Sequence, residues 1–579
     1  MGEQKNLFLA IGLSVAIIII FQFLFPQQSV MTPPTLDEAN QIQPSTSIDK
    51  TQQISDSIVK TKEEIIILNN RVSIATPALQ GSINLKGAIL DDLILLNYNE
   101  SLDKNSKNIN LLLPNQTANP YYIELGWKSL SNESSGIELP DLNTEWNASS
   151  TSLTPNSPIT LFWTNKDNVT FKTHFEIDEN YLFTVTQEIE NNSIKSIEVF
   201  PYRLIKRINM PDTINFFILH EGLISLLNDE LLEKKYKHLL EDCSTTQQIK
   251  STFCDQKSTG GWLGFTDKYW MTALIPDQNK TINVNYRHSN NNKDNFRVGY
   301  AGQVANIKPN TNYIYEGKIF AGAKVLKILK QYQKEHSIVR FDDAIDWGWF
   351  SFLTKPIFIA INWFYGHVGN FGIAIIAFTF LMRIILFPLA HTSFKSMAKM
   401  KKLQPEMQRL KETYPDDRQK MQQELMALYK REGANPIAGC LPIVVQIPIF
   451  FSLYKVLFVT IEMYHAPFYG WIHDLSAPDP AGLLVAFGLI QWNVPDILSI
   501  VNIGILPIFM GFTMWLQQKL NPAPADPTQA KIFAFLPFVF TFILAGFAAG
   551  LVLYWSVNNI LSIAQQWLIQ RKILAKKND

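Results

Sequence analysis

Residues 345–570 consist mostly of long apolar stretches, and the loops between these stretches alternate between loops with Lys and Arg and a loop that has neither. Hydrophobic residues make up 47% of the whole chain, an ordinary share, so the concentration is local. About 20 consecutive apolar residues cross the hydrocarbon core of a bilayer as a helix. The pattern predicts transmembrane helices over 370–390, 435–460, 501–518, 531–549 and 550–570.

The basic residues of the connecting loops indicate how these helices are oriented. Ten Lys and Arg residues lie in 391–434, whereas 461–500 has none, and the 519–530 loop and the 571–579 tail carry basic residues again. Because cytoplasmic loops are enriched in Lys and Arg, the three basic segments are predicted to be cytoplasmic. The 461–500 segment is predicted to be a periplasmic or interfacial loop, although part of it, 481–500, could instead form a seventh span.

A further apolar stretch lies at the N-terminus, where Leu7–Phe25 contains no charge. A cleaved signal peptide is the alternative, but the stretch exceeds the usual apolar region of a signal peptide and no A-x-A-like site follows. We predict an uncleaved transmembrane anchor over 1–25, followed by a flexible linker over 26–62 that is rich in Pro, Gln, Ser and Thr. The expected fold is therefore a polytopic membrane protein with six transmembrane helices and both termini in the cytoplasm.

Residues 63–340 have a different pattern, with short alternating runs such as "YYIELGW" and "VTFKTHFEI" broken by Asn, Ser, Gly and Pro. This punctuation is typical of antiparallel strands and predicts a large periplasmic β-sandwich domain. One helical stretch is expected near Leu223–Leu240. Cys243 and Cys254 could form a disulfide outside the cytoplasm, but their spacing alone does not show it, and two free thiols are the alternative.

Two more segments are predicted to be helical. Residues 341–369 are crowded with aromatic side chains, which favour the headgroup region, so we expect an amphipathic interfacial helix that Pro356 breaks or kinks. A first transmembrane half is the alternative. Residues 391–434 repeat apolar positions at three- and four-residue steps, which predicts a cytoplasmic helical hairpin. Five of the 13 methionines lie there; they suit varied apolar partners, although a simple coiled-coil seam explains them too.

Arg383 is the one charge near the middle of a confidently predicted span, in "FTFLMRIILFP". It lies about six residues, roughly 9 Å, from the cytoplasmic end of that helix. The Cα–Cβ bond tilts toward the helix N-terminus, away from the nearer surface, which argues against snorkelling. A charge held at this depth costs at least ~2.5–3.5 kcal/mol unless it meets water or a partner. We therefore predict that Arg383 lines a water-filled cavity.

Other polar residues of the predicted spans are candidates for the same cavity. Thr379 lies one turn before Arg383, Gln446 lies in 435–460, and Asn558 lies in 550–570. The alternative is that such side chains hold helices together, which is the interpretation we prefer for Gln565 and Gln566.

The spans lack several features that other classes of membrane protein require. No Asp or Glu lies inside them to relay protons, as a proton-coupled transporter would need, and no inverted repeat is visible. No Ser/His or metal-binding His constellation occurs there either, so we expect no enzyme activity, metal or cofactor. Lys+Arg and Asp+Glu are equal at 51 each, which gives no basis for recruiting nucleic acid. A multi-span transporter or channel remains the alternative function.

Several long motifs closely resemble one known family. They are "SMAKMKKLQPEMQRLKETYPDDRQKMQQELMALYKREGANPIAGCLPIVVQIPIFFSLYKVL", "WIHDLSAPDP", "ADPTQAKIFAFLPFVFTF" and "GLVLYWSVNNILSIAQQWLI". All of them resemble the YidC/Oxa/Alb family of membrane protein insertases. "GGWLGFTDKYWMTALIP" resembles the periplasmic domain of the bacterial members, which organellar members lack.

The resemblance implies a five-helix insertase core around a hydrophilic groove that is open to the cytoplasm and to lipid. Arg383 matches the groove arginine and Thr379 the groove threonine, while Tyr554 and Trp555 match an aromatic pair that contacts nascent chains. The implied function is to insert and fold inner-membrane proteins, alone or with the Sec translocase. The implied partners are nascent membrane-protein chains, the Sec translocase, the ribosome and the lipid bilayer. The short, modestly basic tail departs from the family pattern and weakens the case for the ribosome.

Overall fold

The computed structural model describes residues 60–575 apart from 104, 130–136, 214–218, 245–250, 291–292, 416, 434–440, 491, 493, 496–497, 499–500 and 523–526. The predicted anchor (1–25) and nearly all of the predicted linker (26–62) lie outside the described residues. The described chain divides into two compact units that meet in sequence between Asp346 and Trp347, and each unit is described by itself.

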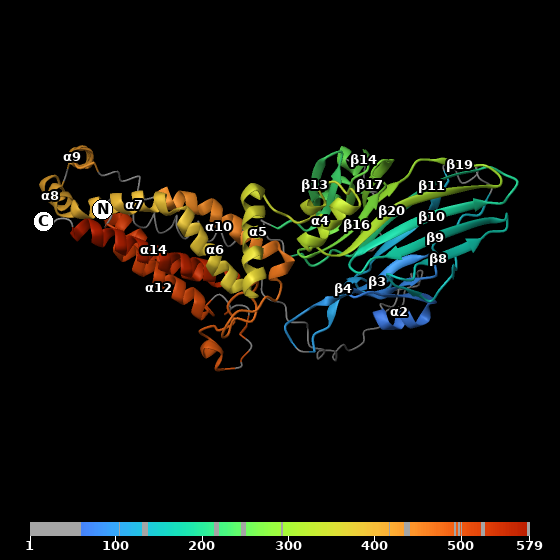
Figure 1. Cartoon of the computed structure of the whole chain (residues 1–579), viewed down its shortest axis with the longest axis horizontal. Coiled ribbons are helices and arrows are strands. Elements are labelled where there is room, and N and C mark those ends of the chain that lie inside the picture. The colour runs from blue at the N-terminus through green and yellow to red at the C-terminus, as the bar shows by residue number, and fades with distance from the viewer. Residues whose placement is uncertain are drawn as a thin grey trace, which may run out of the picture. The chain divides into compact units, whose positions relative to one another are not determined.

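The first unit is built on one eleven-stranded and one nine-stranded sheet, whose pairings are antiparallel except that β1 pairs with β7 in parallel (Figure 1). The first sheet has the order β14-β17-β18-β11-β5-β3-β2-β1-β7, with β19 beside β11 and β4 beside β3, and the second has the order β13-β12-β15-β16-β20-β10-β9-β8-β6. The first sheet contains β1 (Arg71–Ala75), β2 (Leu79–Asn84), β3 (Ile89–Asn99), β4 (Asn108–Leu112), β5 (Tyr121–Lys128), β7 (Ser152–Leu153), β11 (Ile197–Ile208), β14 (Asp255–Thr259), β17 (Thr281–Asn290), β18 (Asp294–Ala301) and β19 (Ala305–Ile307). The second contains β6 (Asn147–Ala148), β8 (Ile159–Thr164), β9 (Val169–Ile177), β10 (Leu182–Asn191), β12 (Gly222–Leu227), β13 (Glu230–Lys234), β15 (Trp262–Thr266), β16 (Trp270–Pro276) and β20 (Thr311–Ala323).

The two sheets face each other across an apolar core, so the predicted β-rich domain is confirmed. Strand β9 shows why, because its alternating sequence buries Phe171, Thr173 and Phe175, while Lys172 and His174 between them are partly exposed. Polar side chains also bond across the interface, and Arg203 is an example. Arg203 on β11 is fully buried and donates from Nη2 to the Val185 carbonyl (2.8 Å) and from Nε to Gln187 Oε1 (3.0 Å), both on β10.

The helix predicted near Leu223–Leu240 is wrong for most of its length. Strands β12 and β13 form a hairpin there, and only Tyr236–Asp242 (α3) is helical. Strand β12 is buried at every position, and a continuous apolar run cannot be told from a buried helix by periodicity. The Asn228–Asp229 pair was the signal for a hairpin that the prediction overlooked. Both residues have positive φ, as a two-residue hairpin turn requires.

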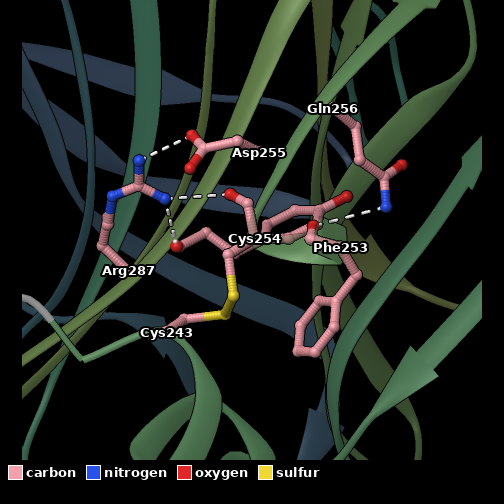
Figure 2. The surroundings of a disulfide bond; sticks show 7 residues. Cys243, Phe253, Cys254, Asp255, Gln256 and Arg287 are labelled. Carbon is pink, nitrogen blue, oxygen red and sulfur yellow. Dashed lines mark hydrogen bonds and ion pairs between the residues drawn. A yellow bond between two sulfur atoms is a disulfide. The ribbon is translucent and has the colours of Figure 1, made fainter. Parts of the chain in front are cut away.

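The cysteines of this unit, for which the sequence left two states open, form a disulfide (Figure 2). Cys243 follows α3, Cys254 ends a short helix, η1 (Thr252–Cys254), and both are fully buried. Arg287 on β17 donates to the Cys254 carbonyl (2.9 Å) and pairs with Asp255 (2.6 Å). The disulfide and Arg287 together fasten α3 and η1 to the edge of the first sheet.

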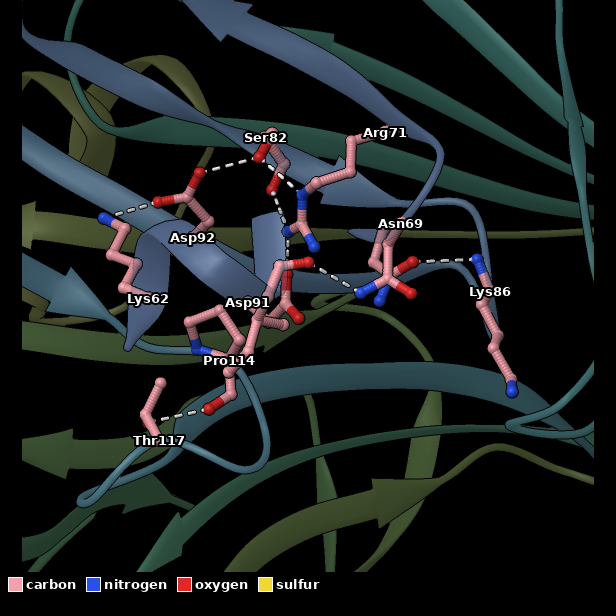
Figure 3. Close-up of polar contacts among 11 residues, drawn as sticks. Lys62, Asn69, Arg71, Ser82, Lys86, Asp91, Asp92, Pro114 and Thr117 are labelled. Atoms are coloured by element: carbon pink, nitrogen blue, oxygen red, sulfur yellow. Dashed lines mark hydrogen bonds and ion pairs between the residues drawn. The ribbon is translucent and has the colours of Figure 1, made fainter. Parts of the chain in front are cut away.

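A polar cluster attaches the first described helix, α2 (Lys62–Leu68), to the same sheet (Figure 3). Lys62 Nζ pairs with Asp92 (2.6 Å) and donates to Asn110 (2.8 Å). Beside them Arg71 pairs with Asp91, and both of these side chains are almost completely buried. Because each buried charge has a partner, the cluster fixes where the chain enters the domain.

His220 gives this unit a dependence on pH. Its Nε2 donates to the Leu223 carbonyl (2.7 Å), and burial lowers its pKa to about 4, against about 6.5 in an unfolded chain. The unfolded state therefore binds more protons between these values, and we expect the domain to lose about 3 kcal/mol of stability as the pH falls from 6.5 to 4. The stability can be measured as the urea concentration at which a phosphine reductant begins to reduce the disulfide. In His220→Gln, the loss of stability between pH 6.5 and pH 4 should be smaller. An unchanged pH profile in that variant would contradict the assignment.

The second unit is helical. Its helices are α5 (Ser351–Val368), α6 (Phe371–Ile385), α7 (Phe387–Lys402), α8 (Gln404–Thr413), α9 (Arg418–Arg431), α10 (Leu441–Val459), α12 (Ile505–Leu520), α13 (Pro527–Ala545) and α14 (Ala549–Ala575), with two short 3-10 helices, η4 (Ile461–Met463) and η5 (Ala486–Gly488). Among the described residues, no single helix combines the length and apolarity of a membrane span. The bent pair of α6 and α7 meets both conditions together, and the shorter apolar helices are Val444–Val459 and Ala530–Ala545.

The segment predicted as one span over 370–390 is broken. The axes of α6 and α7 differ by 67° at the break near Leu386. Pro388 lies in the first turn of α7, where its missing N–H is tolerated and favours the start of a new helix. Leu386 therefore ends α6, and α7 carries the chain on into the predicted hairpin region.

The hairpin predicted over 391–434 consists of the end of α7, then α8 and α9. Four residues of the predicted apolar seam form its buried core: Leu403, Met407, Leu425 and Leu428. Pro405 lies in the first turn of α8, which explains why α7 and α8 are separate helices. Met407 lies in this core and Met400 and Met421 pack against it, as the simpler of the two interpretations had it, whereas Met426 is exposed.

The aromatic segment predicted as one helix over 341–369 is divided between the two units. A 3-10 turn, η2 (Phe341–Ala344), belongs to the first unit, where the Phe341 ring lies 5.5 Å from that of Trp262. The helix itself, α5, begins only at Ser351 and continues through Pro356, so this proline does not end it.

Candidate functional site

Helix α6 places Arg383 against α14. The helix starts at its N-cap residue Asn370, whose side chain accepts from the Ile373 N–H (3.1 Å). Ile375 and Thr379 are fully buried on the face that leads to Arg383, because residues four apart share one side of a helix. Arg383 lies in the last turn of α6, where the negative end of the helix dipole favours a cation.

The Arg383 guanidinium is held by two groups of α14. Its Nη2 donates to the Asn558 carbonyl (2.9 Å) and to the Ser562 hydroxyl. The Ser562 hydroxyl also donates to the same Asn558 carbonyl (2.7 Å). The Nε of Arg383 is enclosed and has no hydrogen-bond partner. Arg383 makes no ion pair within the described part of the chain, so dipoles alone balance its charge there.

The other predicted site residues have different surroundings. Thr379 is fully buried and donates its hydroxyl to the Ile375 carbonyl of its own helix (2.7 Å). Gln446 on α10 donates to the hydroxyl of Tyr554 on α14, and Tyr554 is almost fully buried. Arg383 of α6 and Gln446 of α10 thus both contact α14, at Asn558 and at Tyr554. Thr379 instead bonds to the backbone of its own helix, α6.

Trp555 lies beside this polar row among aromatic side chains. Its ring centroid is 4.7 Å from that of Phe450 on α10 and 5.6 Å from that of Phe540 on α13. Phe450 also stacks on Tyr454, at 6.4 Å between centroids. Aromatic side chains of α10, α13 and α14 therefore lie beside the polar row of α14 that binds Arg383.

A second set of polar contacts joins α14 to α12. Asn559 Nδ2 donates to Thr513 Oγ1 (3.0 Å), Gln566 Nε2 to Asn521 Oδ1 (3.0 Å), and Gln570 Nε2 to the Leu520 carbonyl (3.2 Å). For Gln566 the interpretation as a residue that holds helices together is confirmed. One face of α14 therefore binds α12, and the neighbouring face carries the row with Arg383.

The described part of the 461–500 loop closes the other end of these helices and contains no long helix. Asp479 is buried and accepts from Trp471 Nε1 (3.0 Å) and from the N–H groups of Ala481 (3.0 Å) and Leu506 (2.7 Å). The last of these is at the N-terminus of α12. Carbonyls of the loop likewise accept from Ala549 and Gly550 at the start of α14, so one loop caps both helices.

Sequence reasoning missed Ser562 and Asp479. Ser562 could have been found, because Tyr554, Asn558 and Ser562 follow each other at four-residue steps and must lie on one helix face. Asp479 could not, since its three donors are spread from Trp471 to Leu506. Only the folded loop brings them together.

Comparisons with known proteins match the chain from end to end. The family model "60Kd inner membrane protein" matches residues 363–577, and the model "YidC periplasmic domain" matches residues 71–360. A protein of Granulibacter bethesdensis named membrane protein insertase YidC is 46% identical over 583 residues, which cover 98% of both chains. A protein of the same name from Pelagibacter ubique is 44% identical and covers 99% of this chain and all of its own.

A solved structure described as an active YidC insertase, with its first transmembrane domain resolved, gives a TM-score of 0.36 at 17% identity. It covers 86% of this chain and 92% of its own. The family assignment depends on the two models and the near-full-length relatives. On these matches, the chain belongs to the YidC family of bacterial inner-membrane proteins, with a YidC-type periplasmic domain ahead of its helical membrane part.

Proposed function

We propose that this chain is a membrane protein insertase. It inserts and folds integral proteins of the inner membrane, alone or together with the Sec translocase, and its substrates are nascent membrane-protein chains. The names of its relatives support this assignment. We further propose six spans with cytoplasmic termini, in keeping with the distribution of Lys and Arg among the loops.

The observation that carries the proposal is the state of Arg383. It is a half-buried cation that no carboxylate neutralises among the described residues, and only its Nη2 makes hydrogen bonds. We propose that it lies in a hydrophilic groove between α6, α10 and α14, together with Gln446, Tyr554 and Asn558. A charge kept unpaired in a membrane protein is costly and marks a place where another polar group passes.

In this mechanism the apolar segment of a substrate moves along the aromatic surface around Trp555, while its polar flank enters the groove and meets Arg383. Water in the groove shortens the hydrocarbon path that the polar flank must cross. This lowers the energy barrier, because exposed backbone groups in hydrocarbon each cost several kcal/mol. Thr379 contributes by fixing the backbone of α6 beneath Arg383.

Photocrosslinking distinguishes an insertase from the alternative, a transporter or channel. A photoreactive residue at position 554, in full-length protein in native membranes, should crosslink to stalled nascent chains of membrane proteins. Depletion of the protein should then cause some inner-membrane proteins to remain uninserted. Labelling by small solutes alone, with insertion intact after depletion, would overturn the proposal.

A further inference from the structure

Ser562 determines which edge of Arg383 a passing substrate can reach. A guanidinium grips a carboxylate with two parallel hydrogen bonds, either from Nε and Nη2 or from Nη1 and Nη2. Nη2 belongs to both pairs, and in this structure Nη2 is the nitrogen committed to α14. Nε is enclosed, so the edge formed by Nε and Nη2 faces α14. Nη1 is the nitrogen left accessible.

We propose that Ser562 is a positioning residue that keeps Arg383 from gripping acidic substrate segments with two bonds. A two-bond grip must share Nη2 with the Ser562 hydroxyl and the Asn558 carbonyl, or withdraw it from them. A single bond through Nη1 needs no such exchange. Arg383 therefore attracts an acidic or carbonyl-rich segment and releases it again, as an insertase must do with each successive substrate.

The Ser562 hydroxyl is itself held in place, which makes it suitable for this role. It is almost fully buried, and its bond to the Asn558 carbonyl (2.7 Å) sets its orientation. Serine hydroxyls often bond to the carbonyl four residues earlier in a helix. Here the same hydroxyl also accepts from Arg383, so the acceptor pair is built before any substrate arrives.

Helix α14 offers a matched control. Ser556 is equally buried and donates to the Val552 carbonyl (2.8 Å) by the same four-residue pattern. It has no contact with Arg383 among its hydrogen bonds. Ser556→Ala thus removes a buried hydroxyl from the same helix without changing the hold on the guanidinium.

The test is insertion into proteoliposomes that contain the full chain, and it rests on the proposed function. Two single-span substrates are compared, one with two Asp residues in its translocated segment and one with Asn at the same positions. In Ser562→Ala we expect the acidic segment to stay in the groove about tenfold longer, measured as the period during which it can be crosslinked there. The reason is that one charge-assisted bond no longer competes for Nη2. Insertion of the acidic substrate should slow in step, while the Asn substrate and the Ser556→Ala variant keep wild-type rates. Ser562→Thr, which retains the hydroxyl, should restore the wild-type ratio.

The outcomes separate the two proposals. Equal slowing of both substrates by Ser562→Ala would show a merely structural role for the hydroxyl, and unchanged rates for both would show none; either result overturns the positioning role. Failure of the wild-type protein to insert either substrate would instead overturn the proposed function.

Discussion

Replacing Arg383 with Ala should lower the insertion rate of substrates with polar or acidic translocated segments by about tenfold or more. The variant removes the charge that α6 presents to the polar row of α14 and the donor to the Ser562 hydroxyl, while the Asn558 carbonyl keeps only its bond from Ser562. Loss of about 1.4 kcal/mol of stabilisation at the barrier is enough for a tenfold effect. The measurement is the appearance of a protease-protected segment in proteoliposomes.

Arg383→Lys tests charge separately from geometry. Lysine keeps the charge but lacks the fork that Nη2 belongs to, so its activity should lie between wild type and Ala. Asn559→Ala is the control for lost helix contacts, since it removes an uncharged bond between α14 and α12. Full activity of Arg383→Ala on every substrate would refute an essential electrostatic role.

Replacing Asp479 with Ala should destabilise the helical unit by at least about 3 kcal/mol. The carboxylate accepts three hydrogen bonds in a buried site, and each bond to a charged group contributes about 1.5–3 kcal/mol. Its loss leaves the Leu506 N–H at the start of α12 without a cap. We expect a lower melting temperature in detergent and faster proteolysis of the 464–505 segment, which limited digestion followed by mass spectrometry would measure.

Two variants sharpen this test. Asp417 caps the exposed N-terminus of α9 with a single bond to the Lys420 N–H (2.9 Å), so Asp417→Ala should cost only about 1 kcal/mol. Gly504→Ala disturbs the same site by crowding it, because a Cβ at position 504 would lie 2.5 Å from the Asp479 side chain. If Asp479→Ala proved no more harmful than Asp417→Ala, Asp479 would not be the residue that joins the loop to α12.

Long apolar runs and strand punctuation were enough to predict a helical membrane part and a β-rich domain, because both patterns report burial along one element. The same logic failed at residues 223–240, where a strand buried on both sides has no alternation to detect. It also missed the break at Leu386, because the apolar run continues unchanged through it. Pro388 was visible, but whether a proline bends a helix or starts a new one depends on the neighbouring helices.

For the site, the sequence was enough to place Arg383 inside an apolar helix and to show that no predicted span carries a carboxylate to pair with it. Both facts are local, since hydropathy and charge can be read one segment at a time. The tertiary structure alone decided that Arg383 is held by Asn558 and Ser562, that Cys243 is bonded to Cys254, and that Asp479 caps α12. The partners lie from 11 positions apart, for the two cysteines, to 179 apart, for Arg383 and Ser562, and no local pattern of hydropathy or charge shows which residues packing brings within bonding distance.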